Sequence, residues 1–131
     1  PSFLLADTAR AARMRETYLA SCRQNRLIGI SWRSVNPGMG HQKGLELVDF
    51  LPVLKMTGTT FLNLQYGDVR DEVEALRKNH GIEIRQDPAI DPLADLDAFA
   101  AQLQACDFVV TISNTTAHFA GAIGVPTALY V

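Results

Sequence analysis

Residues 108–131 read FVVTISNTTAHFAGAIGVPTALYV, and their pattern indicates the class of fold. The apolar run at 108–112 is typical of a strand that is buried on both faces. Residues 113–123 have the length and composition of a helix that ends at a glycine, and a proline then opens a second apolar run at 127–131. A strand, a helix and a strand in this order predict a right-handed crossover between two parallel strands.

The same alternation continues toward the start of the chain. Further strands are predicted at 27–32, 60–65 and 82–84. We therefore expect residues 1–131 to form a single doubly wound, Rossmann-like α/β domain, with a parallel sheet of about five strands and helices on both faces. The runs at 27–32, 108–112 and 127–131 are expected to be the central, most buried strands.

Capping residues set the expected bounds of the helices. Asp7 is predicted to cap a helix that extends to about residue 22. Pro52 is tolerated only in the first turn of a helix, so the next cap is placed near Asp49 and that helix begins at Phe50. Gly81 is predicted to end a charged helix at 69–79 in the left-handed conformation. A further helix is expected at 95–105.

Composition excludes several classes of function. The 131 residues carry a net charge of −2 and no long basic run, which disfavours a nucleic-acid partner. The two cysteines, Cys22 and Cys106, lie far apart and are expected to be reduced thiols that take no part in a disulfide framework. No apolar stretch approaches the roughly 20 residues that span a bilayer, and no signal peptide is recognisable, so a cytoplasmic protein is expected. The histidines lie in separate segments, so no metal site is predicted.

Ligands of open parallel sheets bind beyond the carboxyl ends of the strands, where polar side chains gather in this sequence. The sharpest cluster is residues 113–116 (SNTT), at the junction of a strand and a helix. The free N–H groups and the helix dipole at such a junction favour an anion, but plain N-capping by serine or asparagine explains the same residues equally well. The candidate residues are Ser31, Arg33, Lys43, Gln65, Asp87, Ser113, Asn114, Thr115, Thr116 and His118.

Two common nucleotide-binding motifs are missing. The glycine-rich segment after the first strand does not match the P-loop pattern, and no G-x-G-x-x-G follows a strand. Neither a P-loop NTPase nor an NAD-dependent enzyme is therefore expected.

Three motifs occur in a recognisable order: 29–34 (GISWRS), 63–68 (NLQYGD) and 113–126 (SNTTAHFAGAIGVP). They resemble the C-terminal domain of bacterial TPR-repeat glycosyltransferases, relatives of the ADP-heptose:lipopolysaccharide heptosyltransferases of the GT-B superfamily. More distantly, the last motif looks like the donor site of O-linked N-acetylglucosamine transferases. The resemblance covers nearly the whole chain. Ser113 stands where heptosyltransferases carry an acidic residue, which disfavours heptose as the donor sugar.

The resemblance implies a donor-binding domain for a nucleoside-diphosphate sugar, with no metal and no cofactor. Thr115 and Thr116 would contact the diphosphate, with His118 near the phosphate or the ribose. Arg33 or Lys43 would neutralise charge on the leaving group. Gln65 and the 85–87 segment, which includes Asp87, would face the base and the ribose.

The resemblance implies an acceptor-binding N-terminal domain and a general base that are absent from this chain. The chain lacks an initial Met and stops within an apolar run, so both ends are expected to be cut from a longer protein. This chain alone is therefore expected to be inactive, and its uncovered cleft face would favour self-association. Two alternatives remain: a non-catalytic module for sugar-nucleotide or protein recognition, and a sugar-nucleotide epimerase of the same fold.

Overall fold

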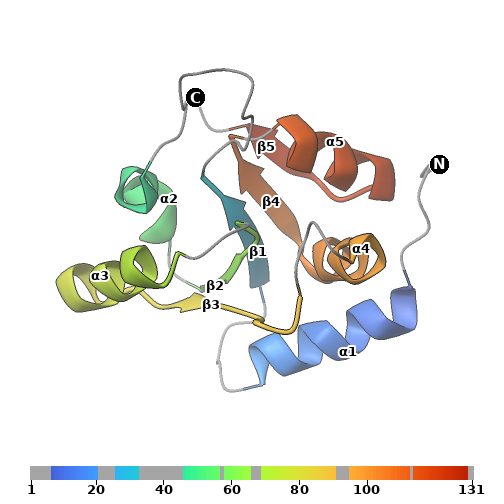
Figure 1. Cartoon of the computed structure of the whole chain (residues 1–131), viewed down its shortest axis with the longest axis horizontal. Helices are drawn as coiled ribbons and strands as arrows, with labels where there is room; N and C mark the ends of the chain where they lie inside the picture. The colour runs from blue at the N-terminus through green and yellow to red at the C-terminus, as the bar shows by residue number, and fades with distance from the viewer. Residues whose placement is uncertain are drawn as a thin grey trace.

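The computed structural model describes residues 7–20, 26–32, 46–56, 58–65, 69–90, 95–112 and 114–129. These residues form a five-stranded parallel sheet with helices on both faces, which confirms the predicted doubly wound α/β fold (Figure 1). The strands are β1 Arg26–Ser31, β2 Thr59–Asn63, β3 Ile84–Arg85, β4 Phe108–Thr111 and β5 Thr127–Leu129. The helices are α1 Thr8–Leu19, η2 Leu47–Phe50, α2 Leu51–Leu54, α3 Arg70–His80, α4 Leu96–Ala105 and α5 Asn114–Ile123.

The strand order is β3-β2-β1-β4-β5, with β1 at the centre. The predicted central positions of β1 and β4 are confirmed, but β5 lies at an edge of the sheet, so the prediction for 127–131 is wrong. Thr127 is partly exposed and Ala128 is exposed, whereas residues 60–62 of β2 are buried. An apolar run in the sequence indicates a strand with few polar side chains. It does not indicate whether that strand pairs with one neighbouring strand or with two.

Each face of the sheet has its own hydrophobic core. α1, α4 and α5 cover one face, and η2, α2 and α3 cover the other (Figure 1). Alternation along β1 divides its side chains between them: Leu27 belongs to the first core, and Ile28 and Ile30 belong to the second. The first core is rich in alanine and leucine, and the second contains Trp32 and Phe50 as its largest fully buried side chains.

Gly29 lies at the centre of β1 because no larger residue fits there. A Cβ at this position would stand 2.3 Å from Leu64 Cδ1 and 3.1 Å from Cys106 Sγ. Leu64 and Cys106 therefore occupy the space that a side chain at residue 29 needs. The central strand is packed directly against the first core.

Cys106 is a free, buried thiol, as predicted. Burial, together with the neighbouring Asp107 carboxylate, raises the pKa of Cys106 to about 12, so the thiol stays protonated and unreactive at neutral pH. Cys22 lies outside the described residues.

The structure confirms two predicted helix ends and corrects a third. The Asp7 carboxylate accepts a hydrogen bond from Arg10 N at 3.0 Å, and Gly81 ends α3 with φ +68°. The helix expected to begin at Phe50 begins earlier, with the 3-10 turn η2. Asp49 is not its cap: the Asp49 carboxylate accepts the Glu46 N–H at 2.8 Å, as the third-position partner in a capping box.

Among the residues that the structure describes, no helix is long and apolar enough to cross a membrane.

Candidate functional site

The strand order reverses direction between β1 and β4. From β1 the chain proceeds through β2 to β3 at one edge, and then crosses to β4 and β5 on the other side. The carboxyl ends of β1 and β4 lie side by side, because Ser31 pairs with Thr111 and Ile112 N donates to Ser31 O at 3.2 Å. Such a switch point opens a crevice, and it is where doubly wound sheets bind their ligands.

Helix α5 begins at this switch point, beyond the carboxyl end of β4. Its first residue, Asn114, comes three positions after Thr111, the last residue of β4. The first N–H groups of α5 have no partner within the helix. They therefore lie next to the carboxyl end of β4, at the switch point. The predicted position of residues 114–116 at a helix N-terminus is confirmed.

The side chains on α5 face different surroundings. Thr116 is buried, with 9% of its surface exposed, and His118 is exposed. Ala120 is fully buried and lets α5 approach the sheet, whereas a Cβ at Gly121 would contact nothing. The close contact between α5 and the sheet is therefore made at Ala120 and does not require Gly121.

Ser31 and Gln65 contact each other at the carboxyl ends of β1 and β2. Gln65 Oε1 accepts hydrogen bonds from Ser31 Oγ at 3.2 Å and from Trp32 N at 2.9 Å. Gln65 is only 6% exposed, and Gln65 N donates to Asn63 Oδ1 at 2.8 Å. The side chain of Gln65 is thus directed at the end of β1 and supports the backbone from which Arg33 follows.

Asp87 is joined to α1. Its Oδ2 accepts a hydrogen bond from the Tyr18 hydroxyl at 2.6 Å, and its Oδ1 accepts from Ala89 N at 3.1 Å. Burial, followed by the Asp87 carboxylate, raises the pKa of Tyr18 well above its usual value, so this hydroxyl remains a donor. Arg85 Nε also donates to Tyr18 O at 2.9 Å. Asp87 therefore anchors α1 to the end of β3.

Three candidate residues, Arg33, Lys43 and Ser113, lie outside the described residues, and so do the side chains of Asn114 and Thr115. Their approach to a diphosphate stays a prediction. Among the described residues there is no group of three side chains that could hold a metal ion.

Glu72 lies in the first turn of α3, and no sequence motif predicts its role at the site. Glu72 Oε2 accepts a hydrogen bond from Trp32 Nε1 at 3.1 Å, and Glu72 Oε1 accepts one from Leu47 N at 3.4 Å. Glutamates are common in the first turn of a helix, because the positive end of the helix dipole stabilises their negative charge. The only signal in the sequence was a tryptophan directly after a strand, and that does not identify its partner.

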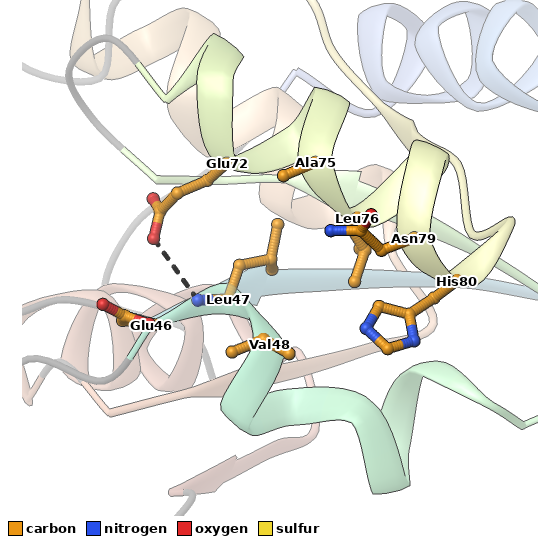
Figure 2. A pocket seen from close by; sticks show the side chains of 8 residues that line it. All are labelled: Glu46, Leu47, Val48, Glu72, Ala75, Leu76, Asn79 and His80. Atoms are coloured by element: carbon orange, nitrogen blue, oxygen red, sulfur yellow. Dashed lines mark hydrogen bonds between the residues drawn. The ribbon is translucent and has the colours of Figure 1, made fainter.

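Glu72 also borders a cavity of about 300 Å³ between η2 and α3 (Figure 2). The cavity lies on the face of the sheet that carries the second core. It combines an apolar lining with two carboxylates, and its residues are Glu46, Leu47, Val48, Glu72, Ala75, Leu76, Asn79 and His80.

The chain is similar over nearly its whole length to part of a longer protein. The chain is 36% identical over 128 residues to Protein FlbA of Caulobacter vibrioides, a match that covers 95% of this chain. The chain spans 21% of the length of that protein. No protein-family model matches the chain. No solved structure matches it either.

Proposed function

We propose that this chain is the donor-binding domain of a glycosyltransferase and binds a nucleoside-diphosphate sugar at the carboxyl ends of β1 and β4. The observation that carries the proposal is the switch point between these strands, at which the N-terminus of α5 begins. The motif at 113–126, one of the three that resemble the C-terminal domain of bacterial TPR-repeat glycosyltransferases, spans this helix.

The chemistry of the site suits a diphosphate. The first N–H groups of α5 and the positive end of its dipole favour phosphate oxygens, and the Thr115 hydroxyl is a further donor. Arg33 follows Trp32 directly, so in the chain it is one residue from a backbone N–H that Gln65 holds in place. Arg33 or Lys43 would supply the positive charge for the leaving group.

In the proposed reaction, an acceptor hydroxyl attacks the anomeric carbon of the donor sugar and gives its proton to a general base, while the bond from that carbon to the diphosphate oxygen breaks. The nucleoside diphosphate leaves with the electron pair of that bond. Groups that are already oriented toward the developing charge lower the barrier most effectively. The general base would come from another part of the protein, so we expect this chain alone to bind the donor without transferring the sugar.

The proposal is tested first by a thermal-shift screen with UDP-, GDP-, ADP- and CMP-sugars, because a ligand that binds the folded state raises the apparent stability. The best nucleotide is then titrated calorimetrically into the wild type and into a Thr115→Val, Thr116→Val variant. Losing hydrogen bonds to a charged phosphate costs about 1.5–3 kcal/mol each, so the affinity should fall by about tenfold or more.

Thr17→Val is the matched control, since Thr17 is an exposed threonine on α1. It should leave the affinity unchanged. Equal affinities of the wild type and the double variant would show that the threonines only cap α5. Donor binding without transfer by the full-length protein would identify a non-catalytic recognition module instead.

A further inference from the structure

The arginines of α1 differ in what they contact. Arg15 is part of the fold, because its Nη1 lies 2.9 Å from Asp107 Oδ2 and donates to Ala105 O at 3.0 Å. Arg10 and Arg13 are one helical turn apart and therefore lie on one face of α1. Within the described part of the chain, neither of their guanidinium groups has an ion pair or a hydrogen bond. The fold thus uses one arginine of α1 and leaves these two for other contacts.

Both of these arginines line a cavity of about 270 Å³ between α1 and the segment that follows β3. Its apolar part is formed by Met14, which packs against the first core, and by Tyr18, which is buried. Arginine, methionine and tyrosine are enriched at protein–protein interfaces, and arginine and tyrosine are also common among the residues that dominate binding energy there. The cavity therefore has the composition of a protein-binding surface.

The hydroxyl groups of this cavity are already used within the fold. Thr17 Oγ1 donates to Arg13 O at 3.0 Å, and the Tyr18 hydroxyl donates to Asp87 Oδ2 at 2.6 Å. The donors left for a ligand are the N–H groups of the two guanidiniums, which accept nothing and pair well with carboxylates. A ligand must therefore supply acceptor oxygens and negative charge.

The Asp87 carboxylate limits which anion suits the cavity. It lines the cavity and is fixed there by hydrogen bonds from the Tyr18 hydroxyl and from Ala89 N at 3.1 Å. Asp87 repels a phosphate group more strongly than a carboxylate, because the charge of a phosphate group at neutral pH is about twice as large. The cavity therefore favours single carboxylates that are joined to apolar groups.

We propose that the cavity beside α1 binds an acidic polypeptide segment from outside this chain, whose carboxylates pair with Arg10 and Arg13. The apolar part of the segment contacts Met14. An exposed arginine–carboxylate pair by itself stabilises little, so both arginines and the apolar contact act together. The proposal concerns protein recognition and does not depend on nucleotide binding at the switch point.

The test is a nuclear magnetic resonance titration with helical probe peptides. The first peptide carries two glutamates on one helical face of an alanine and leucine background, and the second carries glutamines in their place. We expect the glutamate peptide to shift the backbone amide signals of residues 10–18 and the glutamine peptide to leave them unchanged. The shifts should decrease as salt is added, because salt screens exposed ion pairs.

A double variant, Arg10→Gln with Arg13→Gln, removes both guanidiniums and keeps the helix propensity of α1. Its affinity for the glutamate peptide should be about tenfold lower than that of the wild type. The matched control, Lys55→Gln with Lys78→Gln, removes two exposed positive charges from the other face of the sheet and should leave the affinity unchanged. Equal losses in the two double variants would show a general effect of net charge, and the proposal would be wrong.

Asp87→Asn is expected to have the opposite effect. The asparagine oxygen can still accept from the Tyr18 hydroxyl, so the cavity keeps its shape and loses its negative charge. The glutamate peptide should then bind about twofold to fivefold more tightly. A variant that only disturbs the packing of α1 weakens binding, so a lower affinity of Asp87→Asn would contradict the proposal.

Inorganic phosphate and a phosphoserine version of the peptide test the competing kind of anion. The proposal holds if both bind more weakly than the glutamate peptide. If either binds as tightly or more tightly, the cavity is a phosphate site and the proposal is overturned. It is also overturned if the glutamate peptide leaves the signals of residues 10–18 unchanged, because Arg10 and Arg13 are then only solvated.

Discussion

The two ends of β1 are held in different ways. At the amino end, Asp107 Oδ2 accepts the Leu27 N–H at 2.8 Å and lies 2.9 Å from Arg15 Nη1, which also donates to Ala105 O at 3.0 Å. The side chains of this ion pair are 32% and 44% exposed. At the carboxyl end the groups are buried: Ser31 is 3% exposed and Gln65 is 6% exposed.

This difference suggests separate roles for the two ends of β1: the amino end contributes to stability alone, and the carboxyl end also contributes to the proposed nucleotide binding. The ion pair at the amino end links α1 to the turn before β4, where water and salt screen it. At the carboxyl end, Gln65 fixes the backbone next to the switch point, where a misplaced group would be costly to both folding and binding. We therefore expect changes at the amino end to affect stability alone and changes at the carboxyl end to affect stability and nucleotide affinity together.

The largest effect is expected from Gln65→Ala. The substitution leaves the buried Ser31 hydroxyl and Trp32 N–H without the acceptor that they share. At about 1–3 kcal/mol for each of these two unsatisfied groups, the free energy of unfolding should fall by about 2–6 kcal/mol, as measured by urea denaturation. Gln104→Ala, which changes an exposed glutamine on α4, is the control and should be nearly neutral. If Gln65→Ala lowers the free energy of unfolding no more than Gln104→Ala does, the carboxyl end of β1 is not held as we describe.

Gly29→Ala tests the middle of the strand. The new methyl group would overlap Leu64 Cδ1, so Leu64 must move within a packed core, at an expected cost of about 1–3 kcal/mol. Leu64→Val shortens the obstructing side chain and should recover part of this loss in the double variant. The measurement is a double-mutant cycle of unfolding free energies. Additive effects would show that the two residues do not compete for the same space.

The smallest effect is expected from Asp107→Asn. Asparagine removes the charge opposite Arg15 but can still accept the Leu27 N–H, so only the ion pair is lost. For partly exposed pairs this amounts to about 0.2–1 kcal/mol, and the difference from the wild type should shrink as salt is added. Thermal unfolding at low and high ionic strength measures it. A change in nucleotide affinity would contradict the division between the two ends of β1.

Sequence patterns predicted the parts of the fold that depend on neighbouring residues. The alternation of strands and helices, the Asp7 cap, the Gly81 end of α3 and the start of α5 at 114–116 each follow from contacts within a few positions of the chain. The start of the helix around Phe50 at the 3-10 turn η2 was not predicted. Asp49 is suited both to the N-cap position and to the third position of a capping box, and the sequence does not distinguish the two.

Local patterns in the sequence therefore predict the class of fold, the order of its elements and the position of a helix N-terminus after β4. The folded structure was needed to show that β5 lies at an edge, that Gln65 supports Trp32, that Asp87 binds Tyr18 and that Glu72 joins β1 to η2. The physical reason is the separation along the chain over which each kind of interaction acts. Periodicity and capping act within one or two turns, whereas these contacts join residues that are 25 to 69 positions apart, and they form only once the sheet has brought its strands together.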